Sequence, residues 1–393
     1  MARTLRLGVI GLGRAFTLML PTFVADSRIS LAGAADPRPE ARRRFQSEFG
    51  VRTHATIAPL CADPSLDAVY IASPHQFHCE HAVAAARAGK HVLVEKPMAL
   101  SLVDGQSMID AAKNAGAQLI VGHSHSFDLP IRRTRELIAS GDFGRLRMIT
   151  AINFTDFIYR PRRPEELDSG AGGGVVLGQA VHQIDVVRLL AGGRVRSLRA
   201  HAAAFDAERP IEGAYSALLE FDDGAFASLT YSGYAHFDTD EFCEGIGELG
   251  VPTNTGDYGM ARKRLAALRS PDEEVRIKTA RNFGGADSPS SMPAATHHQH
   301  FGLLIASCEH ADLRPTPTGV TIYADSEWRH ETLPPPTVPR REVIDELYDA
   351  VVDAHRPIHD GEWGLATLEA SLALLQSARE KREIVLQHQV ALR

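Results

Sequence analysis

Apolar runs of strand length recur in the first third of the chain, at residues 5–10, 29–35, 67–72, 91–95 and 118–122. Residues 76–88 and 102–115 lie between the later runs and have the apolar spacing of helices. Gly116 follows the second of these segments, where a helix C-cap is expected. Strands that alternate with helices form a parallel sheet covered by crossover helices. The pattern therefore predicts an α/β, doubly wound parallel sheet.

A different pattern begins after Asp128. A helix is predicted over residues 131–139 and ends at Gly141. Strand-like runs follow at residues 146–153, 214–221, 225–231 and 320–324. Long helices are predicted at residues 175–190, 341–355 and 365–380. These elements predict a C-terminal α+β domain built on a largely antiparallel open sheet.

The expected division is one domain of residues 1–124 and a second of residues 125–393. Within the second, residues 245–300 are rich in Gly, Pro, Ser and charge, with one basic helical pattern at residues 260–268. We expect this stretch to be an irregular excursion, either mobile or acting as a lid.

Composition narrows the classes of function. The chain has 393 residues and a formal net charge of -7, and its single short arginine loop argues against nucleic acid as the main partner. Its apolar runs are too short to span a membrane, and the first strand begins too early for a signal peptide, so we expect a cytoplasmic protein. The four cysteines lack C-x-x-C spacing, which favours reduced thiols.

The first strand runs directly into a glycine turn typical of dinucleotide-binding βαβ units. Gly11 permits the tight turn, and Gly13 lacks the Cβ that would hold the backbone away from a pyrophosphate. Phe16 occupies the third glycine position, so either the helix packs less closely on the strand or Ala15 takes that role. The alternative is an ordinary turn between a strand and a helix. The candidate pyrophosphate-side residues are Gly11, Gly13, Arg14, Ala15 and Phe16.

The second strand ends on Asp36, whose carboxylate can accept hydrogen bonds from a ribose hydroxyl. The same charge would repel the additional phosphate of NADP. Arg38 leaves the alternative open, because a guanidinium at this place can hold that phosphate. We therefore expect NAD as the cofactor, with NADP as the alternative, and a small molecule as the substrate.

The strand at residues 91–95 ends abruptly in Glu95-Lys96-Pro97. Ligands of parallel sheets bind beyond the carboxyl ends of the strands, so Lys96 is expected to reach the cofactor crevice. Pro97 restricts Lys96 to an extended conformation and makes a cis peptide possible. An ammonium group there can polarise an oxygen or act as a base. The alternative is a surface lysine that follows a strand.

Gly172-Gly173-Gly174 precedes a helix on which Gln179, His182 and Asp185 recur every three residues. Three glycines allow a ligand or the other domain to approach the start of the helix. The pKa of a histidine lies near working pH, so His182 is the candidate proton acceptor and Asp185 is placed to orient its imidazole. The alternative is a solvated polar stripe with a structural histidine.

Other candidate substrate ligands are basic. Arg160, Arg162 and Arg163 form a loop suited to a carboxylated substrate, and the alternative is a solvated loop or an interdomain ion pair. His123 and His125 follow a strand end and are predicted to bind the substrate, while His78 is expected under the cofactor. No carboxylate or cysteine set completes a shell around the histidines, so we expect no metal.

Together these motifs resemble the glucose-fructose oxidoreductase, inositol dehydrogenase and rhizopine-catabolism family (Gfo/Idh/MocA). The resemblance rests on the glycine turn, Ala72-Ser73-Pro74 with His78, Glu95-Lys96-Pro97, the triple glycine with His182 and Asp185, and residues 361–377. It implies a Rossmann domain and an α+β domain whose open sheet forms a homodimer or homotetramer interface. It also implies that Lys96 and His182 are catalytic and that Ser73, Pro74, Glu95 and Lys96 contact the cofactor.

Family members commonly carry an aspartate four residues before the histidine, and this chain has Gly178 there. That departure suggests a different substrate or a relay through Gln179 or Asp185. A narrower resemblance is to the 4,5-dihydroxyphthalate and phthalate 4,5-cis-dihydrodiol dehydrogenase branch, carried by residues 11–26, 122–128 and 159–168. It implies oxidation of a cyclohexadiene cis-diol bearing two carboxylates. The alternatives are a sugar, inositol or other polyol dehydrogenase and a non-catalytic nucleotide-sensing regulator.

Overall fold

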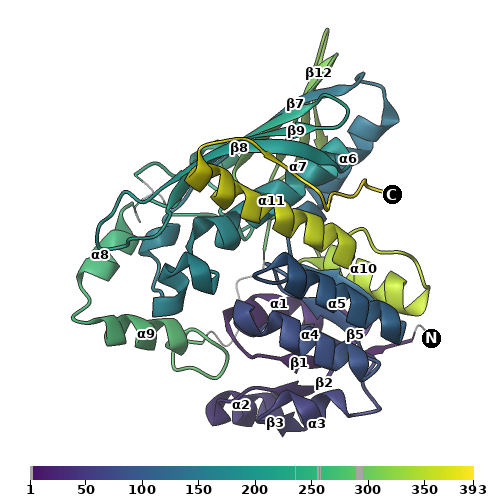
Figure 1. Cartoon of the computed structure of the whole chain (residues 1–393), viewed down its shortest axis with the longest axis vertical. Helices are drawn as coiled ribbons and strands as arrows, with labels where there is room; N and C mark the ends of the chain where they lie inside the picture. Colours follow the sequence, from purple (N-terminus) through teal and green to yellow (C-terminus); the bar gives the residue numbers. More distant parts are fainter. Residues whose placement is uncertain (1–2, 235, 255, 257, 289–294) are drawn as a thin grey trace. The chain divides into compact units, whose positions relative to one another are not determined.

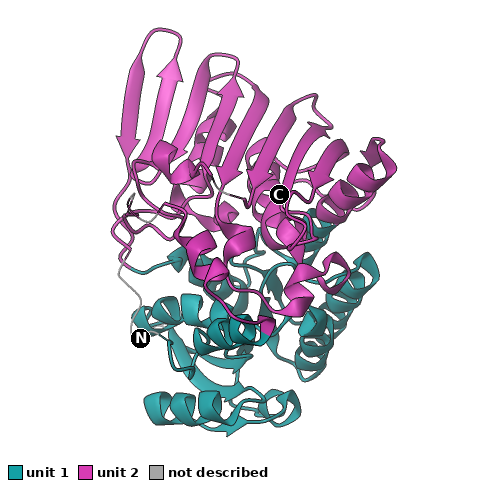
Figure 2. Ribbon diagram, turned by 90° about the vertical axis from the view of Figure 1, so that its left-hand side faces the viewer, with its two compact units in different colours: residues 1–123, 272–293, 338–368 teal, residues 124–271, 294–337, 369–393 magenta. Residues whose placement is uncertain are grey.

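The computed structural model describes residues 3–234, 236–254, 256, 258–288 and 295–393. The chain divides into two compact units, which Figure 2 colours separately. Unit 1 comprises residues 1–123, 272–293 and 338–368, and unit 2 comprises residues 124–271, 294–337 and 369–393. The units differ from the two predicted consecutive domains, because two later segments of the chain join the first unit.

Unit 1 contains a six-stranded parallel sheet in the order β3-β2-β1-β4-β5-β6. Its strands are β1 (Leu5–Ile10), β2 (Ile29–Ala35), β3 (Thr53–His54), β4 (Ala68–Ile71), β5 (His91–Val94) and β6 (Leu119–Val121). Strands β1 to β3 follow one another toward one edge of the sheet, and β4 to β6 toward the other edge. Doubly wound folds bind ligands at this change of direction, between β1 and β4. The predicted doubly wound sheet is confirmed.

Helices alternate with these strands along the chain (Figure 1). They are α1 (Arg14–Ala25), α2 (Pro39–Phe49), α3 (Ile57–Cys61), α4 (His78–Arg87) and α5 (Leu102–Ala115). Helix α5 has the predicted bounds, because Ser101 caps its first turn and Gly116 ends it in the left-handed conformation.

The later segments of unit 1 pack on this sheet. Helix α10 (Arg341–Val352) and the first part of α11 (Gly361–Glu380), up to Leu368, belong to the unit. Asp360 forms a β-bridge with Ile120, and a Cβ added to Gly364 would lie 2.5 Å from the Val121 side chain. This close packing joins residues far apart in the sequence, which no local pattern predicts.

Unit 2 is built on a nine-stranded sheet in the order β14-β13-β12-β11-β7-β10-β9-β8-β15. Strands β7 (Leu146–Phe154) and β10 (Phe226–Ser232) pair in parallel, and the other neighbours pair antiparallel. The remaining strands are β8 (Val195–Ala203), β9 (Ala214–Phe221), β11 (Leu303–Cys308), β12 (Ala311–Thr316), β13 (Gly319–Ala324), β14 (Trp328–Thr332) and β15 (Ile384–Val385). The predicted, largely antiparallel sheet is confirmed.

Two helical segments of unit 2 bear on function. Helix α6 (Leu129–Ser140) ends at Gly141 as predicted. The helix predicted over residues 175–190 begins instead as a π-helical turn, Val176–Ala180, and continues as α7 (Val181–Ala191). Such wide turns are rare and often occur at functional sites.

The predicted irregular excursion contains more regular structure than expected. Helix α8 (Met260–Ala266) matches the basic pattern, but α9 (Pro271–Ala280) was not predicted. Helix α9 has no buried residue among those described, and it therefore has no need of the one-sided apolar pattern by which a helix is recognised in a sequence. Within the described residues, no helix combines the length and apolarity needed to cross a membrane.

Candidate active site

The glycine turn after β1 is packed tightly against the end of β4. Gly11 adopts a φ of +88°, and an added Cβ would lie 2.6 Å from the Ser73 amide nitrogen. Gly13 is the N-cap of α1 and has no side chain to cover the first turn. The amide groups of that turn and the helix dipole both favour an anion. The backbone therefore fits a dinucleotide pyrophosphate.

Asp36 and Arg38 form a closed pair at the end of β2. The Asp36 carboxylate accepts a hydrogen bond from the Leu12 amide at 2.7 Å, and from Nε and Nη2 of Arg38 at 3.0 and 3.1 Å. Nη2 of Arg38 also donates to the Leu12 carbonyl at 2.8 Å. The two residues that the sequence placed in competition for a ribose or its phosphate are thus held together.

Phe16 has a packing role in place of the third glycine. Its ring is fully buried and lies 5.8 Å from the Phe45 ring and 5.2 Å from the Phe283 ring, measured between centroids. Phe283 comes from the excursion, so sequence analysis had no means of pairing it with Phe16. The observed contacts explain why a large side chain is accommodated here.

His78 joins the loops that follow β4 and β5. Its two ring nitrogens lie 2.9 Å from the carbonyl oxygens of Ser73 and Pro97, and burial lowers the pKa of the imidazole to about 4. The hydroxyl of Ser73 also lies 2.9 Å from Nδ1 of His81. His78 therefore braces the loop containing Ser73 and Pro74, both predicted to contact the cofactor.

Glu95 and Lys96 differ in exposure at the end of β5. Glu95 is buried and accepts a hydrogen bond from the Tyr70 hydroxyl at 2.6 Å, and burial raises the pKa of its carboxyl. Lys96 is half-buried, and its peptide bond to Pro97 is cis. The positive charge of Lys96 acts in the opposite direction to burial and lowers the pKa of Glu95, while cofactor contacts of both residues stay predictions.

The polar stripe on the helix of unit 2 is buried, which contradicts a solvated face. Gln179, His182 and Asp185 are each less than a tenth exposed. Asp185 accepts a hydrogen bond from the Ser126 hydroxyl, which comes from the turn before α6. This contact fixes the carboxylate that sequence analysis assigned to orienting His182, and the catalytic roles themselves stay predictions.

His125 lies directly against His182. The two imidazole rings are 4.9 Å apart between centroids and meet edge to face, and Phe301 packs on both. Nδ1 of His125 lies 2.7 Å from Asp128, and Nε2 lies 3.5 Å from Glu248. Burial alone would lower the pKa of His125, but the two carboxylates raise it to about 9. His125 is therefore an imidazolium near neutral pH.

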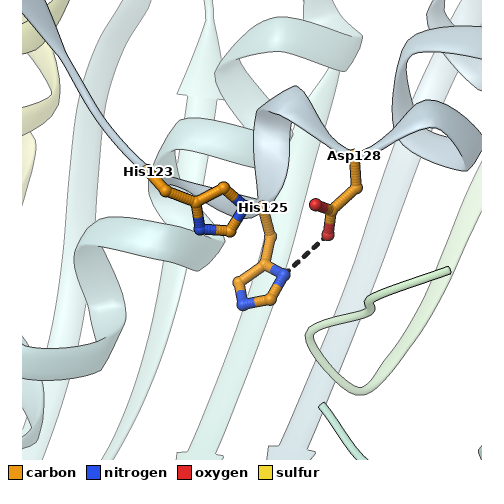
Figure 3. Close-up of side chains that lie close together, drawn as sticks. All are labelled: His123, His125 and Asp128. Carbon is orange, nitrogen blue, oxygen red and sulfur yellow. Dashed lines mark hydrogen bonds and ion pairs between the residues drawn. The ribbon is translucent and has the colours of Figure 1, made fainter. Parts of the chain in front are cut away.

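Figure 3 shows His123, His125 and Asp128, three buried residues whose ligand atoms all lie within 4.8 Å of one another. The histidines alone suggested no metal site, because Asp128, three positions after His125, was not recognised as a carboxylate that completes the set. A metal bound here would have to displace the proton that His125 holds between the two carboxylates. Glu248 lies in the excursion, where the sequence offered no indication of its role.

The triple glycine and Gly178 serve contacts within unit 2. A Cβ on Gly173 would lie 2.5 Å from the Glu166 carbonyl oxygen, and one on Gly174 would meet the Glu212 carboxylate. A Cβ on Gly178 would lie 3.0 Å from Cζ of Phe157. The residue that replaces the family aspartate therefore makes room for an aromatic ring.

The Phe157 ring contacts Arg162, one of the predicted substrate ligands. The Arg162 guanidinium lies 3.6 Å from the Phe157 centroid, and its Nη2 donates to the Phe157 carbonyl at 2.6 Å. Arg162 is 8% exposed, and burial lowers its pKa to about 10. Phe157 thus connects a buried cation with Gly178, one helical turn before His182.

All three loop arginines have acidic partners. Arg162 lies 3.6 Å from Glu166, Arg160 pairs with Asp156 at 2.7 Å, and Arg163 pairs with both Glu165 and Glu166 at 3.1 and 3.3 Å. Arg163 is therefore the weakest candidate for binding a substrate carboxylate. Arg209 is 5% exposed and its charge acts on Arg162, so it joins the candidates although its isolated position in the sequence gave no signal.

The comparisons with known proteins agree with these features. Residues 5–123 match the GFO/IDH/MocA oxidoreductase family, NAD-binding Rossmann fold, and residues 131–251 match the GFO/IDH/MocA C-terminal domain. A relative from Comamonas testosteroni, 1-carboxy-3-chloro-3,4-dihydroxycyclohexa-1,5-diene dehydrogenase, is 48% identical over 95% of each chain. The myo-inositol 2-dehydrogenase of Thermotoga maritima is 29% identical over 63% of this chain and 74% of its own.

Solved structures support the same fold. A chain from Bordetella bronchiseptica RB50 is 40% identical, with a TM-score of 0.91 over 98% of this chain and 100% of its own. The WlbA dehydrogenase of Bordetella pertussis, solved with NADH and UDP-GlcNAcA, has a TM-score of 0.69 at 22% identity, over 98% of this chain and 99% of its own. This protein is therefore an oxidoreductase of the GFO/IDH/MocA family, with an NAD-binding Rossmann domain in residues 5–123.

Proposed function

We propose that the protein is an NAD-dependent dehydrogenase that oxidises a carboxylated cyclohexadiene cis-diol, such as phthalate 4,5-cis-dihydrodiol, toward the catechol. The observation that carries this proposal is the buried Arg162, stacked on Phe157 beside Gly178. A buried guanidinium near the helix of His182 suits a substrate carboxylate. The name of the Comamonas testosteroni relative, which specifies a carboxylated dihydroxycyclohexadiene, supports the same substrate class.

In the proposed reaction each residue has a separate task. His182 accepts the proton of the reacting hydroxyl, and Lys96 stabilises the developing alkoxide by its charge. A nicotinamide held at the glycine turn would supply the hydride acceptor for the same carbon. Loss of that proton and hydride leaves a hydroxyketone, which becomes a catechol by tautomerisation. The imidazole ring of His125 lies against that of His182, with the ring centroids 4.9 Å apart, and so helps to hold His182 in place.

The residues of unit 1 support NAD as the cofactor. The turn from Gly11 to Gly13 would hold the pyrophosphate, and Asp36 would face the adenosine ribose. Asp36 is 5% exposed and forms an ion pair with Arg38. A 2′-phosphate would be repelled by the Asp36 carboxylate, and Arg38 would be occupied by that carboxylate. NADP would therefore have to break this ion pair to gain the arginine.

The test is a rate assay of cofactor reduction with phthalate 4,5-cis-dihydrodiol, the monocarboxylated diol of the relative's type, myo-inositol and a sugar panel, with NAD and NADP offered separately. We expect the carboxylated diols to react with NAD, and Arg162→Ala to raise KM for them by about tenfold or more, the loss of one charge-assisted pair. Arg196→Ala is the matched control, because Arg196 is exposed on β8 and pairs with Glu220.

The rival functions give different results. A polyol dehydrogenase would reduce NAD with neutral substrates and would be insensitive to Arg162→Ala. A nucleotide-sensing regulator would bind NAD tightly and turn over none of the substrates. Reaction with a sugar and none with either diol would refute the proposal.

A further inference from the structure

A segment of the excursion around Phe283 packs against helices of unit 1. The Phe283 ring is 1% exposed, and its centroid lies 5.2 Å from that of Phe16 and 6.0 Å from that of Phe45. The Arg44 guanidinium covers the ring at 4.6 Å. All of these residues belong to unit 1. Phe283 and the adjacent Gly284, which we call the latch, therefore anchor residues 272–288 to helices α1 and α2.

Gly284 shows how closely the segment approaches. Its φ is +80°, and an added Cβ would lie 2.6 Å from the Ala41 Cα. Backbone cannot move as easily as a flexible side chain, so this position accepts only glycine without displacing the segment. The docking is thus specified by two neighbouring residues, an aromatic ring and a glycine.

The latch also reaches Arg38. Nη1 of Arg38 donates to the Phe283 carbonyl oxygen at 3.4 Å, a long hydrogen bond. The other guanidinium nitrogens donate to the Asp36 carboxylate and to the Leu12 carbonyl. The arginine is therefore held on three sides, and one of these sides is the excursion.

This arrangement affects which dinucleotide binds. To hold a 2′-phosphate, the Arg38 guanidinium would have to leave Asp36 and turn toward the phosphate. A ribose hydroxyl needs only one acceptor position on Asp36, which a small shift of Arg38 provides. An anchor that resists rotation of Arg38 thus opposes NADP more than NAD.

We propose that the latch of Phe283 and Gly284 is a specificity element, which selects NAD over NADP by holding Arg38 on Asp36. Phe283 and Gly284 act as positioning residues through Arg38. The inference rests on the proposed preference for NAD, but it does not depend on the identity of the diol.

The experiment measures dissociation constants of NADH and NADPH by fluorescence titration of the full chain without substrate. The readout is selectivity, the ratio of the NADPH constant to the NADH constant. We expect Phe283→Ala to lower this ratio by about tenfold, the size of one charge-assisted hydrogen bond to phosphate. Gly284→Ala should act in the same direction without leaving a cavity, and it serves if Phe283→Ala does not fold.

Two further variants separate selectivity from general damage. Phe23→Ala removes a buried ring of α1 that packs on Tyr70, and it should leave the ratio unchanged. In an Arg38→Ala background, Phe283→Ala should no longer change the ratio. An unchanged ratio in both latch variants, or a change that persists without Arg38, would overturn the inference alone. Tighter binding of NADPH by the unaltered chain would overturn the proposed NAD preference as well.

Discussion

His125 is paired with two carboxylates of the chain, which its sequence position does not indicate. Its place just beyond β6 predicts a substrate ligand, and that role stays a prediction, while both ring nitrogens face carboxylates in the structure. Asp128, three residues later, could have been recognised as a partner from spacing alone. Glu248 could not, because it lies more than a hundred residues later, in the irregular excursion. Individual charges in this site are thus set by long-range partners.

The paired His125 leads to a prediction about pH. The folded-state pKa of His125, about 9, exceeds the ordinary value of 6.5. The pair therefore contributes its full stability below about pH 6.5 and loses it as the pH rises through 9. We expect Asp128→Asn to be less stable than the unaltered chain at neutral pH, by on the order of 2 kcal/mol, and this gap to shrink above pH 9.

Urea unfolding of both proteins at several pH values measures the gap directly. The comparison of two proteins cancels the titration of lysines and tyrosines that they share. A gap that stays constant up to about pH 10 would show that His125 holds no extra proton in the folded protein. Arg147→Ala provides a control, since Arg147 is half-exposed and its pair with Glu309 contains no histidine.

At the scale of elements, periodicity predicts the regular parts of the fold and fails at the irregular ones. Strands β1, β2 and β9 have the predicted bounds, because their apolar runs are bordered by turn residues. Four of the five residues of the π-helical turn before α7 are buried, so the segment has no one-sided apolar pattern that would separate it from an α-helix. Helix α9 begins with Pro271 and three acidic residues, a start signal that could have been recognised.

The π-helical turn carries a prediction about Gly178. Restoring the family aspartate with Gly178→Asp would drive a Cβ against the Phe157 ring and displace the Arg162 stacked on it. A displacement of about 1 Å in a positioning group can cost 10²-fold in rate, so we expect at least a tenfold loss in kcat/KM for a carboxylated diol. A neutral polyol makes no use of Arg162 and should be less affected.

The ratio of the two kcat/KM values is the measurement, since a folding defect lowers both equally. Gly178→Ala adds the Cβ without the carboxylate, so it should cause part of the same loss if crowding of the Phe157 ring is the cause. Equal losses in kcat/KM on both substrates would mean that Arg162 does not bind the substrate carboxylate.

At the scale of the whole molecule, the large sheet of unit 2 has one face with buried residues and an opposite face with exposed apolar side chains. Its core face is formed by alternate residues such as Ala217, Leu229 and Ile322, which are 3% exposed or less. The register across β7, β11 and β12 places Leu218, Tyr323 and Trp328 on the opposite face. These three side chains are 43%, 42% and 64% exposed. Large apolar residues on an open sheet favour burial against a second chain.

We therefore predict a homo-oligomer that assembles through this face of the sheet. Light scattering on a sizing column should give a mass of two or four chains, and Leu218→Glu combined with Tyr323→Glu should shift it to one. Val103→Glu is the control, because Val103 is 76% exposed on α5 in unit 1 and lies off the sheet. An unchanged unfolding midpoint would establish that the charged variants stay folded. A single-chain mass for the unaltered protein across all concentrations would contradict the prediction, and the exposed apolar face would then require another partner.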